Sequence, residues 1–283
     1  MAQLPPPHPD PHPPRRLVAP AGACDAHCHI FGPFARFPTP EGASYRPAET
    51  PLEHYRAMAD RLGLARAVFV QPAIYGSDHS VMLDAIARGH GAYAGVGILD
   101  DTLGDATLTA LHIGGLRGAR FNFVGHLGAR PDRAMIERTA ARVALLGWHL
   151  VFHLDEAALR AEADWIAGLG VPVVIDHMAR LDAGSDAFAV LLGLACLPHV
   201  WVKISAADRI CADGDLSRAL PFMAALADAA PERTLWGTDW PHPNIGWMPD
   251  DGDLIDLLAL AVPDATARHA ILVDNPARLY SFS

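Results

Sequence analysis

The hydrophobic pattern of the chain alternates between two periods from residue 23 onward. Short runs of apolar, β-branched and aromatic residues recur, and longer segments with apolar residues three and four positions apart separate them. The run Val-Val-Ile at 173–175 is apolar at every position, which is typical of a strand covered on both faces. Eight strands are predicted, at residues 24–29, 66–71, 93–99, 116–123, 149–154, 171–177, 200–205 and 234–239.

The segments between these strands have the period of amphipathic helices. In residues 131–146, Ile136, Ala140 and Val143 recur at spacings of four and three, and residues 215–229 repeat the pattern. Each set marks one apolar face of a helix. Strands that alternate with helices eight times predict a closed (β/α)8 TIM barrel, and an open doubly wound sheet is the alternative.

The chain is long enough for one such domain. Its 283 residues exceed the roughly 250 that an α/β barrel commonly needs, so residues 23–283 are predicted to form a single barrel domain. Residues 1–22 are rich in proline, which removes backbone donors and favours extended chain, and they are predicted to form a flexible extension. His8 and His12 in this extension are interpreted as solvated side chains.

Composition and net charge limit the kinds of molecule that the protein is expected to bind. Hydrophobic residues make up 51% of the chain and charged residues 19%, which is sufficient for a large core. The net charge of −10 gives no electrostatic reason to expect nucleic acid or an anionic membrane as a partner. A local cluster of arginines would still allow an anionic small-molecule substrate. A homo-oligomer is left open by the sequence.

The sequence predicts a cytoplasmic protein. There is no run of 18 apolar residues that would predict a membrane span, and the N-terminus lacks the charged start and apolar stretch of a secretory signal. Four cysteines in a chain of this length do not resemble a disulfide framework, which favours free thiols in a reducing compartment.

The motif Asp-Ala-His-Cys-His at 25–29 is the strongest local signal for chemistry. Because side chains alternate along a strand, His27 and His29 point to the same face at the carboxyl end of the first predicted strand. Two imidazoles there are suited to binding a metal or a substrate oxygen. Taken alone, the pair is equally compatible with two histidines that are hydrogen-bonded in a polar loop.

Three further residues lie at equivalent strand ends. His153 is in the fifth predicted strand, His177 ends the sixth and Asp239 ends the eighth. Active sites of α/β barrels are built at the carboxyl ends of the strands. The sequence therefore predicts that four histidines and one aspartate meet in a single site.

Four segments together resemble a known family. They are CDAHCHIFGP at 24–33, RGARFNF at 117–123, VVIDHMAR at 173–180 and GTDWPHPN at 237–244. With these residues the chain resembles the amidohydrolase superfamily, in particular the amidohydrolase-related branch of 2-pyrone-4,6-dicarboxylate lactonase and other lactone hydrolases and isomerases. The resemblance covers nearly everything after residue 22.

The resemblance implies roles for individual residues. Asp239 corresponds to the general base, and His177 is the second catalytic residue, close to the substrate carbonyl. Arg120, Arg180 and Arg209 are similar to arginines that bind substrate carboxylates, a role that suits the rigid donor fork of guanidinium. His242 is a further candidate for substrate contact, and capping of its own loop is the alternative.

The resemblance also bears on a metal. A lysine common on the fourth strand of the superfamily is absent, and Arg120 and Asn122 stand there instead, which argues against a two-metal site. A histidine at position 153 completes a candidate set for one zinc or manganese ion, made of His27, His29, His153 and Asp239. Catalysis without metal remains the alternative. Lys203, in the seventh strand, is interpreted as pointing between the barrel and the helices.

The resemblance and the arginines together predict a hydrolase. Its substrate is expected to be a small lactone with carboxylate or sulfonate groups, opened by water that a carboxylate base activates. Two alternatives share the scaffold: a lactone isomerase, in which a substrate hydroxyl replaces water, and a metal-dependent decarboxylase of an aromatic or enol acid.

Overall fold

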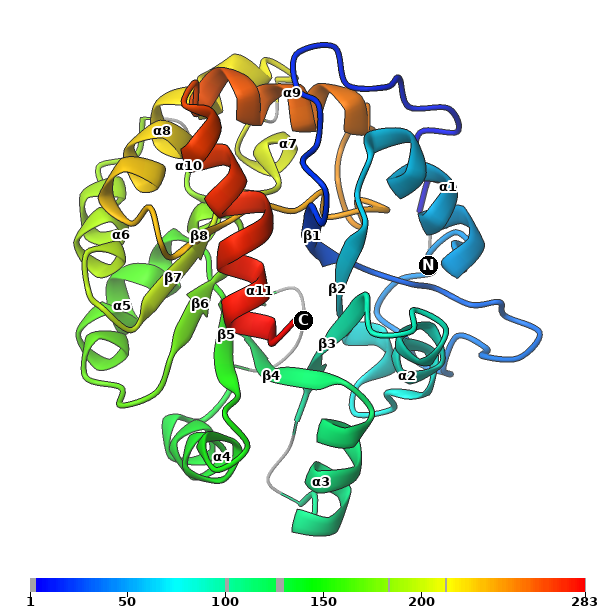
Figure 1. Cartoon of the computed structure of the whole chain (residues 1–283). Coiled ribbons are helices and arrows are strands. Elements are labelled where there is room, and N and C mark those ends of the chain that lie inside the picture. Colours follow the sequence, from blue (N-terminus) through cyan, green and yellow to red (C-terminus); the bar gives the residue numbers. More distant parts are fainter. Residues whose placement is uncertain (1–3, 100–101, 126–129, 183, 212, 283) are drawn as a thin grey trace.

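The structure is a computed structural model that describes residues 4–282 apart from 100–101, 126–129, 183 and 212. Eight parallel strands lie in chain order and curl into a barrel, with helices on the outside (Figure 1). The predicted barrel is confirmed, and the open sheet is excluded. The strands are β1 (Cys24–Cys28), β2 (Arg66–Val70), β3 (Tyr93–Ile98), β4 (Leu116–Asn122), β5 (His149–His153), β6 (Val173–Ile175), β7 (Val200–Lys203) and β8 (Thr234–Leu235).

The first and last strands meet through the backbone that follows β8. Ala26 donates its N–H to the carbonyl of Trp236 at 2.9 Å, and Asp239 donates to the carbonyl of His27 at 2.8 Å. Gly237 allows this approach, because a Cβ at that position would lie 2.5 Å from the His27 nitrogen. The barrel therefore closes next to the Asp-Ala-His-Cys-His motif and brings it against the chain that carries Asp239.

Helices cover the outer face of the barrel. Their buried residues recur at helical spacing; in α4, Ile136, Ala140 and Val143 face inward as the sequence predicts. The α-helices are α1 (Leu52–Leu62), α2 (Ser80–Ala87), α3 (Asp105–Ile113), α4 (Arg133–Ala144), α5 (Glu156–Ala167), α6 (Phe188–Ala195), α7 (Ala207–Ile210), α8 (Leu220–Ala229), α9 (Asp251–Ala261), α10 (Ala265–His269) and α11 (Asn275–Tyr280). None of the helices in the described ranges is long and apolar enough to cross a membrane.

The proline-rich segment before the barrel runs past α9 and α1 (Figure 1). The backbone N–H of His12 donates to the carboxylate of Asp250, and the N–H groups of Arg15 and Arg16 donate to Asp256. The His12 ring lies 2.8 Å from Asp253, so it is not the solvated side chain that the sequence suggested. Proline has no N–H to donate, and the residues between the prolines supply these contacts.

Strands β6 and β8 end earlier than the sequence predicts. The chain leaves β6 at Ile175 and enters the short helical segment η3 (Asp176–Arg180). From His177 to Arg180 the φ angles lie between 50° and 54°, in the left-handed region. Side chains other than glycine pay about 1–2 kcal/mol per residue there, and such strain tends to be kept at functional sites. Asp239 also has a positive φ, of 64°.

Candidate active site

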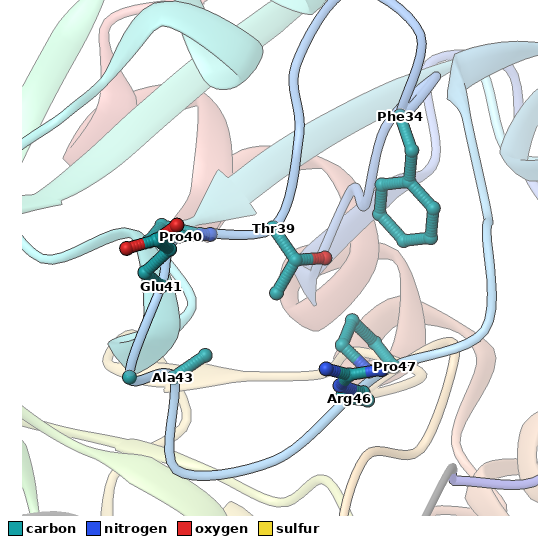
Figure 2. A pocket seen from close by; sticks show the side chains of 8 residues that line it. Phe34, Thr39, Pro40, Glu41, Ala43, Arg46 and Pro47 are labelled. Carbon is teal, nitrogen blue, oxygen red and sulfur yellow. The ribbon is translucent and has the colours of Figure 1, made fainter.

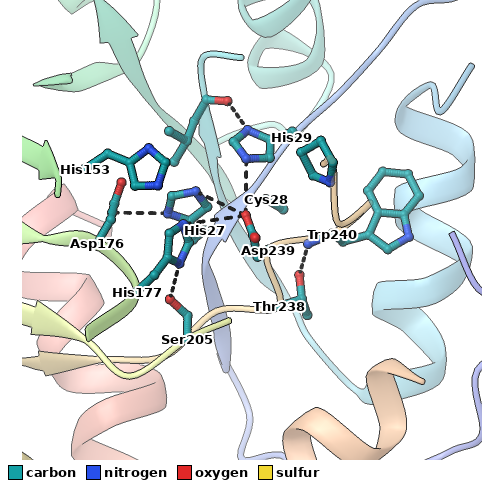
Figure 3. Close-up of polar contacts among 12 residues, drawn as sticks. His27, Cys28, His29, His153, Asp176, His177, Ser205, Thr238, Asp239 and Trp240 are labelled. Atoms are coloured by element: carbon teal, nitrogen blue, oxygen red, sulfur yellow. Dashed lines mark hydrogen bonds and ion pairs between the residues drawn. The ribbon is translucent and has the colours of Figure 1, made fainter. Parts of the chain in front are cut away.

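The predicted site residues meet at the carboxyl ends of the strands. Figure 3 shows that the side chains of His27, His29, His153, His177 and Asp239 converge, although they come from β1 and β5 and from the segments that directly follow β1, β6 and β8. All five are buried, with at most 5% of their surface exposed. The sequence-based prediction that these strand ends form one cluster agrees with this arrangement.

Three imidazoles surround a single carboxylate oxygen. The Nε2 atoms of His27, His29 and His177 lie 3.6, 3.3 and 3.6 Å from Oδ1 of Asp239. Oδ2 of the same carboxylate is bound by Arg209, with nitrogens at 2.5 and 2.6 Å. Oδ1 is therefore the oxygen that faces the site, and within the described chain it has no hydrogen-bond partner.

The other ring nitrogens fix the orientation of these imidazoles. Nδ1 of His29 donates to the carbonyl of Val70 at 2.7 Å, since a carbonyl oxygen can only accept. Nδ1 of His177 lies 2.9 Å from Oγ of Ser205 (Figure 3). The other ring nitrogen of His29, Nε2, faces Oδ1 of Asp239 at 3.3 Å.

Burial and neighbouring charges set the ionisation of the site. Burial would raise the pKa of Asp239, but the charge of Arg209, aided by His177, holds that pKa well below its usual range. Burial lowers the pKa of His177 to about 3, against the opposing charge of Asp239. Burial and then the charge of Lys203 lower the pKa of His27. At neutral pH the site therefore holds the ionised carboxylate of Asp239 beside the neutral imidazoles of His27 and His177.

This donor set fits a metal cation. His27, His177 and Asp239 each offer a ligand atom within 4.8 Å of the others, and all three are buried. Neutral imidazole and carboxylate are ligands of first-row divalent metals. The buried Nε2 of His27 and Oδ1 of Asp239 have no other partner in the described residues, as expected of atoms that face a cation.

The composition of this triad differs from the predicted ligand set. His177 takes the place that the sequence gave to His153, whose Nδ1 lies 3.2 Å from the amide oxygen of Asn122. His29 reaches Asp239 but is not one of the three residues that share metal spacing. Strand ends alone could not distinguish these positions, because the left-handed turn after β6 directs His177 inward.

The three predicted arginines line the same cavity but differ in their partners. Arg120 donates from Nε to Asp176 at 3.0 Å, and Arg209 is held by Asp239. Arg180 forms no hydrogen bond or ion pair with any other described residue. Its guanidinium is therefore the cation most available to a substrate anion, and the unused nitrogens of Arg120 are the next.

The cavity at the cluster is small. It measures about 30 Å³, far below the roughly 300–1,000 Å³ of a pocket for a drug-sized ligand. Figure 2 shows a larger cavity, of about 350 Å³, in the connection between β1 and α1. Its polar side chains include Glu41 and Arg46 but no histidine. Volume alone would therefore have selected the wrong pocket.

His242 does not line the cavity, contrary to its predicted contact with substrate. Its Nε2 lies 3.0 Å from Asp251, and its Nδ1 lies 3.9 Å from Asp208, with all three side chains fully buried. Burial would lower the pKa of His242, but Asp251 and Asp208 raise it. The alternative interpretation, a residue that holds its own loop, is the one that this geometry supports.

Replacing His242 by alanine is expected to destabilise the fold rather than alter substrate binding. The change leaves Asp208 and Asp251 buried without their cationic partner, and breaking a buried pair costs about 3–5 kcal/mol. Chemical denaturation measures this loss. His54→Ala, at an exposed histidine, is the matched control and should change the free energy of unfolding little. Unfolding of His242→Ala at the denaturant concentration of the unmodified protein would contradict this role.

Sequence analysis missed two charged residues of the site. Lys203 is fully buried and points into the barrel, 3.1 Å from both His27 Nδ1 and Asp176 Oδ1, so the interpretation that it lies outside the barrel is wrong. Alternation along β7 contains the signal, because Trp201, two positions earlier, packs in the interior cluster. Asp176 directly precedes His177, but nothing in the sequence marks it as part of the site.

Comparison with known proteins identifies the family. The model of the amidohydrolase family matches residues 24–282. The chain belongs to the amidohydrolase family. It is 41% identical to a 4-sulfomuconolactone hydrolase of Rhizobium radiobacter, over 94% of this chain and 92% of that protein. It is 38% identical to a 2-pyrone-4,6-dicarboxylate hydrolase of Comamonas testosteroni, over 92% and 90%.

A solved structure gives the same result for the fold. An apo protein of Agrobacterium tumefaciens superposes with a TM-score of 0.81 at 27% identity, covering 98% of this chain and 99% of that one. The range that matches the amidohydrolase family, residues 24–282, spans the whole barrel and the positions of the cluster described above.

Proposed function

We propose that this amidohydrolase opens a small lactone that carries carboxylate or sulfonate groups. The observation that carries the proposal is the placement of Oδ1 of Asp239, which has no hydrogen-bond partner in the described residues, beside three imidazoles and in the same cavity as Arg180, whose guanidinium has no partner among those residues either. A base beside an anion-binding group suits hydrolysis of an acidic ester. The two curated relatives are named as hydrolases of such lactones, which supports the same class of substrate here.

The chain's own residues account for the steps of ring opening. Arg180 and Arg120 bind the acid groups and orient the ring, as guanidinium forks do for planar anions. Oδ1 of Asp239 accepts a proton from a water molecule while the oxygen of that water attacks the lactone carbonyl. The ring C–O bond then breaks, and Asp239 returns the proton to the leaving oxygen. His177, buried beside Asp239, is placed to stabilise the charge that develops on the carbonyl oxygen.

A divalent metal, zinc or manganese, is part of the proposal. His27, His177 and Asp239 would hold it, with His29 and His153 close by. When bound there, such an ion supplies Lewis acidity toward the carbonyl or lowers the pKa of a bound water. A homo-oligomer and a cytoplasmic location remain predictions of the sequence.

Chelation is expected to remove the activity. Elemental mass spectrometry of the purified protein should find about one zinc or manganese per chain, as for other single-ion hydrolase sites. Dialysis against a chelator should abolish turnover, and adding the ion back should restore it. Full activity in metal-free protein would contradict the metal and leave the histidines and arginines to polarise the carbonyl alone.

Titration of released acid tests the proposed reaction. Opening a lactone releases one proton, so a pH-stat assay with a panel of lactones follows turnover directly. Lactones with carboxylate or sulfonate groups should be opened, and neutral lactones of the same ring size should be poor substrates. Turnover that favours the neutral lactones, or no ring opening in the panel, would contradict the proposal.

A further inference from the structure

Asp176 connects three strands beneath the candidate active site. Its Oδ1 lies 3.3 Å from Nδ1 of His27 on β1 and 3.1 Å from Nζ of Lys203 on β7. Its Oδ2 accepts a hydrogen bond from Nε of Arg120 on β4 at 3.0 Å. Asp176, His27 and Lys203 are fully buried, and Arg120 is nearly so. Figure 3 shows Asp176 on the side of the His27 ring away from Asp239.

Two tautomers of His27 are compatible with its position. Nδ1 can donate to Asp176, or it can accept from Lys203, whose ammonium lies 3.1 Å away. In the second case the proton of the ring is on Nε2. The nearest carboxylate oxygen to Nε2 is Oδ1 of Asp239 at 3.6 Å, which is beyond hydrogen-bond distance.

The first tautomer directs the ring proton toward a buried carboxylate oxygen that needs a donor. Oδ1 of Asp176 has no hydrogen-bond partner among the described residues, and it lies 3.3 Å from Nδ1 of His27 and 3.1 Å from the ammonium of Lys203. With the proton on Nε2, a buried N–H is left without an acceptor, which is costly. His29 provides a parallel, since its Nδ1 is committed to Val70 and its Nε2 faces the same oxygen of Asp239.

We propose that Asp176 is a positioning residue that holds the Nδ1–H tautomer of His27, so that the Nε2 lone pair faces Asp239 as a ligand. Lys203 and Arg120 balance the charge of Asp176 and keep its carboxylate in place. This inference deepens the proposed function, on which it rests for the role of His27, but it concerns the ring itself. A carboxylate behind a ligating histidine fixes both its tautomer and its orientation.

Nuclear magnetic resonance of the full chain with ¹⁵N-labelled histidine tests the proposal. The His27 signals are assigned by their loss in His27→Gln. In the unmodified protein without metal, Nδ1 should carry the proton and Nε2 should not. In Asp176→Asn, Lys203 loses its carboxylate partner and donates to Nδ1 instead, so the proton should move to Nε2. A proton on Nε2 in the unmodified protein overturns the proposal without recourse to any variant.

Zinc affinity gives a second measurement that does not depend on turnover. In competition with a chelator, Asp176→Asn should bind zinc about 10- to 100-fold more weakly, the usual cost of losing such a partner. The matched control is Glu162→Gln, because Glu162 on α5 is also buried and paired with two arginines, Arg130 and Arg133, but is remote from His27. Equal zinc affinity in the two variants, or an unchanged His27 tautomer in Asp176→Asn, overturns the proposal. If the lactone assay alone fails, the proposed function is contradicted, while the His27 tautomer and the zinc affinity still decide this inference.

Discussion

Replacing Asp239 by asparagine is expected to lower kcat by about 10²- to 10⁴-fold, the contribution typical of general base catalysis. Asparagine keeps the shape of the side chain, but it cannot accept a proton from water at neutral pH. The pKa of Asp239 lies well below its usual range because Arg209 and then His177 outweigh burial, so the base is fully ionised in the working enzyme. Steady-state kinetics on an acidic lactone measure the loss.

The control for this variant is a measurement of whether it keeps the native fold. Asp239→Asn should retain the near-ultraviolet circular dichroism of the unmodified protein, and the KM should change less than kcat, because Arg180 and Arg120 bind the substrate. A variant with nearly normal turnover would show that another group accepts the proton. The role assigned to Oδ1 would then be wrong.

Replacing Arg180 by methionine is expected to have the second largest effect, on kcat/KM. Arg180 is the guanidinium of the cavity that has no partner among the described residues, and its pKa is lowered by burial and then by the nearby charge of Arg209. Loss of one partner of a buried charge pair costs about 2–5 kcal/mol, which corresponds to a fall of roughly 30- to 5,000-fold in kcat/KM. The measurement is kcat/KM for a lactone with a single carboxylate.

A neutral lactone of the same ring is the matched substrate for this prediction. It lacks the acid group that Arg180 binds, so Arg180→Met should leave its slow turnover almost unchanged. Arg180→Lys should recover part of the activity toward the acidic lactone, because the charge returns without the bidentate fork. An equal loss of kcat/KM for acidic and neutral lactones would contradict a role in substrate binding. It would show that Arg180 stabilises the η3 turn instead.

Sequence periodicity was sufficient for the barrel and for most of the cluster. Strand alternation placed His27 and His29 on one face, and the rule that barrel sites form at carboxyl ends brought in His177 and Asp239. These inferences succeeded because they depend only on regular geometry, which repeats along every strand of the barrel.

The remainder of the site depends on irregular backbone. His177 and Arg180 lie in a left-handed turn, and His242 itself has a positive φ of 59°, so no period predicts where their side chains point. Alternation along β7 indicates that Lys203 points inward, but its pairing with Asp176 across the barrel leaves no mark in a local pattern. Partners that come from distant strands can be recognised only when the three-dimensional arrangement is known.

The source of the oxygen in the product tests the central claim most directly. The enzyme is incubated with an acidic lactone in H₂¹⁸O, and the product is examined by mass spectrometry. Hydrolysis through water activated by Asp239 predicts one ¹⁸O atom in the newly formed carboxyl group of a ring-opened acid. An unlabelled product of the same mass as the substrate would show isomerisation by an internal hydroxyl, and loss of CO₂ would show decarboxylation; either result would contradict the account.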